Sequence, residues 1–272
     1  MLNFIASKYD ENHKFVGMKL TFLGTGTSQG VPVIACDCEV CLSDDPRDKR
    51  LRSSVMITVD GTNYVVDAGP DFRQQMLREK VRDLRAILFT HEHKDHVAGL
   101  DDVRAFNFKH QKNMDVYADT NVQKALHREY PYIFAAIKYP GVPSVEIHLV
   151  DKKNPFYIDK HLFTPIEVLH YKLPVLGYRI GGLTYITDAK TISRVEIEKI
   201  KGTEVLVLNA LRIEEHISHF NLEEALELIA LIQPKHAYLT HISHLMGLHE
   251  SVSKQLPSNV SIAYDGLQVN LE

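Results

Sequence analysis

A dense run of potential metal ligands constrains this chain more than any other feature. The stretch FTHEHKDHVAGL, residues 89–100, overlaps the end of the apolar run RAILFT at 85–90. It places four ligand-type residues on an expected loop at the carboxyl end of a strand, where α/β sheets usually carry their sites: His91, His93, Asp95 and His96. The residue four positions after His91 is an aspartate, so the His-Glu-x-x-His helix of zinc proteases is absent. The alternating spacing predicts a tight turn that directs side chains to two neighbouring metals, in preference to a solvated polar loop.

The rest of the chain alternates strand-like and helix-like segments. Short β-branched or apolar runs predict strands, at 18–24, 54–60, 63–69, 85–90, 115–119, 163–169, 177–189, 204–210, 236–241 and 260–271. Helical spacing lies between them, for example at 72–81 and 100–108. Two halves that each combine hairpins with helices predict an α/β fold with two sheets face to face and helices outside, a four-layered αββα sandwich. We expect an N-terminal extension at 1–17 and a single hydrolase-sized domain at 18–272.

Local signals predict several element boundaries in the second half. Asn221 followed three residues later by Glu224 is an N-cap signal for a helix that runs to Ile232. A second helix is expected over 245–256. The proline-containing stretch 138–159 predicts a loop or lid, or a plain surface loop.

Composition limits the compartment and the partners. No apolar run has the length of a signal peptide or of the roughly 20 residues that a membrane span needs, so we expect a cytoplasmic protein with no membrane partner. The formal charge of −4 and the lack of a long Lys/Arg block argue against a nucleic-acid surface. We therefore expect a small-molecule substrate, and the sequence leaves a homodimer open.

The chain contains three cysteines, all within ACDCEVC at 35–41: Cys36, Cys38 and Cys41. Thiols this crowded cannot form a paired disulfide framework, and in a reducing compartment such clusters more often hold a metal. Three reduced surface thiols are the alternative. A metal site here needs a fourth ligand from another part of the chain.

The histidine-rich stretch, preceded by LGTGTS at 23–28 and VVDAG at 65–69, resembles the metallo-β-lactamase fold superfamily over essentially residues 18–272. The resemblance implies one metal held by His91, His93 and His170, a second held by Asp95, His96 and His241, and Asp188 as the bridge between them. Each later ligand ends a predicted strand; taken singly, His170 or His241 could be a core histidine and Asp188 a helix cap. Asp67, at the end of NYVVD, is expected to orient a ligand histidine by accepting its second N–H.

Three further segments resemble the PhnP-type cyclic phosphodiesterases of the carbon-phosphorus lyase pathway, which are relatives of tRNase Z. They are the cysteine insertion, HISHFNLEEAL at 216–226, and the tail that runs from LTHISH at 239–244 to LPSNVSIAYDGLQV at 256–269. In that group the cysteine cluster and a late histidine form a structural zinc site, which implies His244 as the fourth ligand. The resemblance also implies that His219 protonates the leaving group, with His216 as its rival; a polar loop before a helix is the alternative for both. Residues 97–160 carry no motif that aligns with this group.

These features predict a metal-dependent hydrolase of a small or cyclic phosphodiester. Two divalent metals, Zn or Mn, would lower the pKa of a bridging water and polarise the phosphoryl oxygens, with one further structural Zn. Asp95 and Asp67 serve the centre as ligand and orienting group, and His219 acts as general acid. Three alternatives stay open: a tRNA 3′ processing nuclease, an acyl hydrolase such as a lactonase or thioesterase, and an iron-dependent redox protein of the same fold. The sequence lacks the Gly-rich basic arm expected of the nuclease.

Overall fold

The computed structural model describes residues 17–271, and the expected extension at 1–17 lies almost entirely outside this range. The first sheet has the order β15-β1-β2-β3-β4-β5-β6. Its strands are β1 (Met18–Gly24), β2 (Ser54–Val59), β3 (Thr62–Val66), β4 (Ala86–Leu88), β5 (Met114–Ala118), β6 (Val145–Leu149) and β15 (Gln268–Leu271). Strands β3 to β6 run parallel, so their carboxyl ends share one edge.

The second sheet has the order β11-β8-β9-β10-β12-β13-β14, and β7 (Phe156–Ile158) pairs with β8 outside this path. Its strands are β8 (His161–His170), β9 (Leu173–Ile180), β10 (Leu183–Ile186), β11 (Thr191–Ile192), β12 (Val205–Asn209), β13 (His236–Thr240) and β14 (Val260–Ile262). Strands β10, β12, β13 and β14 are parallel. Both sheets therefore bring several strand ends, and the polar residues that follow them, to a common edge.

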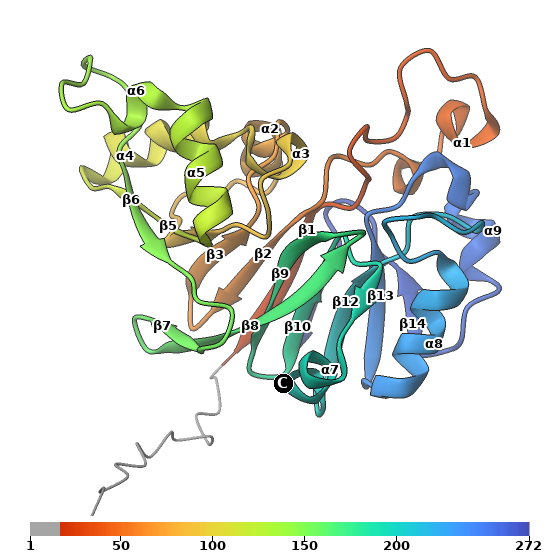
Figure 1. Cartoon of the computed structure of the whole chain (residues 1–272). Coiled ribbons are helices and arrows are strands. Elements are labelled where there is room, and N and C mark those ends of the chain that lie inside the picture. Colours follow the sequence, from red (N-terminus) through yellow and green to blue (C-terminus); the bar gives the residue numbers. More distant parts are fainter. Residues whose placement is uncertain (1–16, 272) are drawn as a thin grey trace, which may run out of the picture.

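Helices cover the outer face of each sheet (Figure 1). On the first sheet lie α2 (Phe72–Arg78), α3 (Lys94–Val97), α4 (Arg104–His110), α5 (Thr120–Glu129) and α6 (Pro131–Phe134), with the 3-10 turn η2 (Leu100–Val103). On the second lie α7 (Arg194–Ile200), α8 (Leu222–Ile232) and α9 (His249–Ser253). The segment with α1 (Glu39–Leu42) and η1 (Pro46–Asp48) lies beside the C-terminal part of the chain, near η3 (His244–Met246).

Three apolar layers separate the four structural layers. One lies between the sheets and includes the fully buried Phe22, Tyr64 and Tyr178. The second packs α7 to α9 against their sheet, and the third packs α2 to α6 against the other. Full burial of one large apolar side chain stabilises the folded state by about 1.5–3 kcal/mol, so these three layers hold the sheets and helices together. The predicted αββα sandwich is confirmed.

Two element predictions were wrong. The stretch 138–159 is not one loop, because it contains β6 and β7; β6 is a partly exposed edge strand whose side chains alternate weakly between inside and outside. The helix expected over 245–256 is split into η3 and the short α9, since Gly247 between them has φ of 101°, a left-handed conformation that no helix continues. The helix from Leu222 to Ile232 has the predicted capping box between Asn221 and Glu224.

No helix in the described part of the chain is long and apolar enough to cross a membrane.

Candidate metal centre

The predicted ligands follow strand ends at one edge of the sandwich. His91 and His93 come after β4, His170 ends β8, and Asp188 and His241 follow β10 and β13. The predicted loop after β4 is partly helical, since Asp95 and His96 lie in the single-turn α3.

Three residues that leave strands at this edge have positive φ: Asp67 at 65°, Asp188 at 55° and His241 at 57°. A non-glycine residue in this conformation costs about 1–3 kcal/mol and persists only where its surroundings impose it. Backbone strain at this edge therefore coincides with two predicted ligands and with the residue expected to orient a third.

The first predicted ligand set forms a cluster of rings. The His91 and His93 ring centroids are 4.5 Å apart, those of His93 and His170 are 5.2 Å apart, and those of His91 and His170 are 6.0 Å apart. His91 is buried, whereas His93 is exposed and His170 half-buried. An open side is what a catalytic metal position requires, because substrate and water must reach it.

In the second predicted set His96 and His241 are buried and Asp95 is half-buried, and this set meets the first at Asp188. The donor atoms of Asp95, His96 and His241 lie within 4.8 Å of one another. Asp188 contributes to two other groups of this kind, one with His91 and His96 and one with His170 and His219. Its two oxygens are 3.1 Å from His241 Nε2 and 3.3 Å from His96 Nε2. The central position of Asp188 fits the bridging role that we predicted.

Hydrogen bonds fix which nitrogen of three histidines faces the centre. His96 Nδ1 donates to Oδ2 of Asp67 over 2.7 Å, and His170 Nδ1 donates to the carbonyl oxygen of Ser218 over 2.8 Å. Thr90 gives its hydroxyl proton to Asp67, so its oxygen is left to accept from His91 Nδ1 at 3.0 Å. In each ring the other nitrogen, Nε2, keeps its lone pair for a metal.

The buried nitrogens fit a metal ion. His91 Nε2, His96 Nε2 and His241 Nε2 make no hydrogen bond, although unpaired buried polar atoms are rare in native proteins. His96 Nε2 lies 3.1 Å from Asp95 Oδ2, and His241 Nε2 lies 3.1 Å from Asp188 Oδ1. Each pair is close, but neither is aligned as a hydrogen bond. Imidazole nitrogens and carboxylate oxygens that converge without hydrogen bonds between them are what a divalent cation would join.

Burial and charge act on the same groups in opposite directions. Burial is the largest cause for His91 and lowers the pKa of its imidazole well below the usual range. Burial also opposes ionisation of Asp188, but His241, His96 and His219 together outweigh it and hold the pKa of this carboxyl well below its usual value. Both shifts favour the forms that bind metal, a neutral imidazole and an anionic carboxylate. At His96 and His241 the neighbouring carboxylates outweigh burial and raise the imidazole pKa, to about 9 for His241, so in the metal-free protein these two rings hold protons that a bound cation would displace.

Next to the ligands, His219 is the nearest candidate proton donor. It is 8% exposed, and its Nε2 lies 3.1 Å from Oδ1 of Asp188, whereas His216 contacts His219 and no ligand. Burial lowers the pKa of His219 to about 4 against the raising effect of Asp188. His219 also shares a potential ligand group with His170 and Asp188, so geometry alone allows it to be a ligand as well as an acid.

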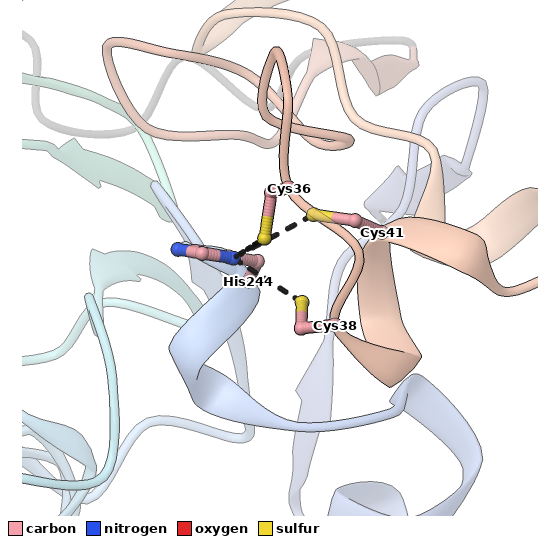
Figure 2. Close-up of side chains that lie close together, drawn as sticks. All are labelled: Cys36, Cys38, Cys41 and His244. Carbon is pink, nitrogen blue, oxygen red and sulfur yellow. Dashed lines mark hydrogen bonds between the residues drawn. The ribbon is translucent and has the colours of Figure 1, made fainter.

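The three cysteines and His244 form a second, separate cluster (Figure 2). Their sulfurs point at His244 Nδ1 from distances of 3.3 Å for Cys36, 3.3 Å for Cys38 and 3.5 Å for Cys41. A tetrahedral zinc with Zn–S of about 2.3 Å and Zn–N of about 2.0 Å separates sulfur from nitrogen by about 3.5 Å. The four atoms are therefore spaced as a closed zinc site requires, which fits the fourth ligand that we predicted.

A buried polar network ties the cysteine segment to the C-terminal part of the chain. Arg50 donates to Thr25 Oγ1 at 2.9 Å, to the Ala263 carbonyl at 2.6 Å and to His249 Nδ1 at 3.3 Å. The His249 backbone N–H in turn donates to Asp48 over 2.8 Å. These hydrogen bonds and the cysteine cluster both join the cysteine segment to the C-terminal part of the chain, next to the loop that carries His241.

Sequence reasoning missed four residues that support the centre. Thr90 and the Ser218 carbonyl orient ligand histidines, Thr187 donates to Asp188 over 2.6 Å, and Asn209 exchanges two hydrogen bonds with the Ala189 backbone. The pattern that identified Asp67, a polar residue at the end of an apolar strand, would also have identified Thr90 and Asn209. A backbone carbonyl leaves no such signal.

A further acidic group, Asp115, Glu146 and His148, lies on β5 and β6 outside the site. Arg85 already pairs with Asp115, so this group is an ion-pair cluster at the sheet edge.

Comparison with known proteins agrees with this geometry. The model of the Beta-lactamase superfamily domain matches residues 62–242, more than half of the chain. This chain belongs to the beta-lactamase superfamily. Within the superfamily it is similar to a solved structure described as a new diphosphatase from the PhnP family, with 38% sequence identity, a TM-score of 0.89, and coverage of 95% of this chain and 98% of that one. The predicted family resemblance is confirmed.

Two curated proteins that match this chain are longer than the matched region. A protein of Porphyromonas gingivalis named octanoyltransferase is 39% identical over 257 residues, which are 94% of this chain and 52% of that protein. A ribonuclease Z of Methanococcus maripaludis is 26% identical over 195 residues, 69% of this chain and 55% of that protein. The chain thus spans about half the length of the curated relatives it matches.

Proposed function

We propose that this chain hydrolyses a small or cyclic phosphodiester with two divalent metals, Zn or Mn, at the centre around Asp188. The observation that carries the proposal is the meeting of two histidine-rich ligand sets at one carboxylate, with His219 3.1 Å from that carboxylate. A pair of divalent ions, when bound, supplies Lewis-acid polarisation of phosphoryl oxygens and a hydroxide nucleophile at neutral pH.

The protein's own residues hold and orient this centre. Asp67 and Thr90 fix the rings of His96 and His91, and the Ser218 carbonyl fixes His170. Thr187 holds one oxygen of Asp188. Because these ligands are already held in place, they do not have to reorganise during the reaction. Such preorganisation of polar groups is the main source of electrostatic catalysis.

His219 delivers a proton to the departing oxygen in this proposal. To carry that proton at neutral pH, His219 needs a pKa above the value of about 4 that burial imposes in the absence of ligands; the negative charge of a bound phosphate raises the pKa, and the cations beside Asp188 oppose that rise. A departing alkoxide needs this proton, whereas a departing p-nitrophenolate does not.

The similar proteins support a phosphorus centre over a carbonyl. The PhnP-family relative is called a diphosphatase, which adds a diphosphate bond to the substrates worth testing. The ribonuclease Z match keeps an RNA phosphodiester as second candidate, against the net charge of −4. The name octanoyltransferase belongs to a protein about twice as long, so the matched half need not carry that activity.

A substrate panel tests the proposal. The chain, loaded with Mn or Zn, is incubated with bis-p-nitrophenyl phosphate, a 2′,3′-cyclic nucleotide, a ribosyl cyclic phosphate, a nucleoside diphosphate, a precursor tRNA and a lactone. We expect metal-dependent hydrolysis of the small phosphodiesters, with the cyclic ones preferred. Turnover of the lactone alone, or of none of these compounds at any metal loading, would overturn the proposal.

A further inference from the structure

A groove of about 300 Å³ lies between α2 and α4, on the outer face of the first sheet. Its floor is apolar and buried, with Phe72 and Met76 one turn apart on α2 and Phe106 facing them from α4. Leu77, at its edge, is 61% exposed. This volume is at the lower end of the range for ligand pockets, so it suits one small molecule better than the row of side chains that a docked helix inserts.

The rim of this groove is cationic, although the chain as a whole is not. Arg73, Arg82 and Lys109 line it together with one carboxylate, that of Asp102. The formal net charge of the chain is −4, so the sign of the charge here is opposite to that of the whole molecule. A local cluster of cations beside an apolar floor attracts a ligand that has an apolar body and an anionic head.

The guanidinium groups of Arg73 and Arg82 are not engaged by the protein. Arginines elsewhere bind carboxylate or carbonyl oxygens, as Arg52 binds Asp71 over 3.1 Å. Within residues 17–271, only Arg194 shares with Arg73 and Arg82 the lack of such a partner. Two of these three unpaired guanidinium groups therefore lie on one groove, with their N–H donors left for an anion.

Hydrogen bonds hold the walls of the groove in place. At one end, Lys109 Nζ donates to the Arg82 carbonyl over 2.6 Å, and His110 Nε2 lies 3.2 Å from the same oxygen. Nearer the sheet, the Gly99 N–H donates to the Ala68 carbonyl over 2.8 Å, which joins the turns that precede α2 and α4. A ligand therefore meets a groove that is already formed, which lowers the entropic cost of binding.

We propose that the groove between α2 and α4 binds a medium-chain aliphatic carboxylate. Its chain lies against Phe72, Met76 and Phe106, and its carboxylate accepts hydrogen bonds from Arg73 and Arg82, whose planar donors match that head group. None of these residues belongs to the metal centre, so this site is separate from the proposed hydrolysis and does not depend on it.

Methyl NMR with decanoate as the probe tests the proposal on the full chain. Decanoate, kept below its micelle concentration, is titrated into protein labelled with ¹³C at the methionine methyl groups, and Met76→Leu assigns the Met76 signal. That signal should shift in a saturable manner, while the signal of Met246, in the apolar layer of the other sheet, should stay in place. Decanol and decyltrimethylammonium should bind at least about 10-fold more weakly, because neither offers an anionic acceptor to the arginines.

Two variants test the two halves of the site. Arg73→Gln combined with Arg82→Gln should weaken decanoate binding by about 10- to 100-fold, the usual effect of losing hydrogen bonds to a charged group. Arg194→Gln is the matched control, since it removes the other unpaired, exposed arginine, and it should change nothing. Ala105→Phe, which fills the groove from an exposed position, should abolish the shift of Met76 in an otherwise unchanged spectrum.

Several outcomes would overturn the proposal. They are a Met76 signal that decanoate leaves in place, equal binding of the three decyl compounds, and decanoate binding that survives the double arginine variant. A carboxylate bound only to a metal would give the first of these. A Met76 shift that appears only with an acidic amphipathic peptide, or only as the protein concentration rises, would also overturn it and identify a partner helix or a second copy of this chain as the occupant.

Discussion

At the residue scale, Asp188 is the side chain on which most of the centre depends. It is 2% exposed and lies within reach of both predicted ligand sets. Asp188→Ala should remove bound metal and lower turnover by more than the roughly 100-fold that loss of a merely orienting residue can cost. Metal analysis and hydrolysis of a phosphodiester check this, with the exposed Glu223→Ala as the matched control. Full activity and unchanged metal content in Asp188→Ala would contradict the two-metal assignment.

His219 has two possible roles that one variant separates. If His219 is the general acid, His219→Ala should reduce turnover by about 10²- to 10⁴-fold on substrates with poor leaving groups and much less on p-nitrophenyl esters, with metal content intact. If it is a ligand, the variant should lose metal and be equally slow on both substrates. Turnover and metal content of the same preparation, compared with wild type, decide between them.

Most of the site could be predicted at this scale, and the remainder could not for a physical reason. Side-chain ligands such as His91 and Asp95 carry their chemistry in the sequence, and their spacing reveals it. The Ser218 carbonyl that orients His170 is a backbone atom, and every residue has one. Asp and His adopt positive φ more often than most residues, but tertiary contacts decide that Asp67, Asp188 and His241 do so here.

At the scale of elements, the cysteine segment and the turn after β13 meet at the second cluster. His244 is three residues beyond His241, so a metal that joins His244 to the cysteines also restrains the loop that presents His241. Cys38→Ser and His244→Ala should each lose about one zinc per chain and melt at a lower temperature, while the Asp188 centre stays partly loaded. Zinc analysis and thermal unfolding measure both effects. Unchanged zinc and stability in His244→Ala would mean that another group closes the site or that it holds no metal.

How well a strand could be predicted depends on how completely its side chains are buried. Strand β12 could be predicted because Val205 to Leu208 form a continuous apolar run and the strand is buried along its whole length. Strand β6, at the sheet edge, has only partly buried or exposed side chains, and the prolines around it favour a loop in the sequence. The break between η3 and α9 depends on the backbone conformation of Gly247, which residue spacing does not report.

At the scale of the whole molecule, the buried pair of Arg50 and His249 joins the N-terminal and C-terminal parts of the chain. Burial is the larger cause, with the Arg50 and Arg47 charges added, and together they lower the pKa of His249 to about 4. An unfolded histidine titrates near pKa 6.5. Between about pH 6.5 and 4 the unfolded chain therefore binds a proton that the folded chain does not.

The sign of the effect follows from this difference in bound protons. Above about pH 6.5 His249 is neutral in both states and adds no pH dependence; as the pH falls toward 4, the free energy of unfolding decreases by up to about 3 kcal/mol because of this group. His249→Asn keeps an acceptor for Arg50 but does not titrate. Its loss of stability between pH 7.5 and 5.0 should therefore be smaller than that of wild type by about 2 kcal/mol. Urea unfolding of the metal-loaded proteins at both pH values measures this, and protonation of the metal ligands cancels because both proteins share it. Equal losses in the two proteins would show that His249 is not the buried neutral group that joins residues 48–50 to the C-terminal segment.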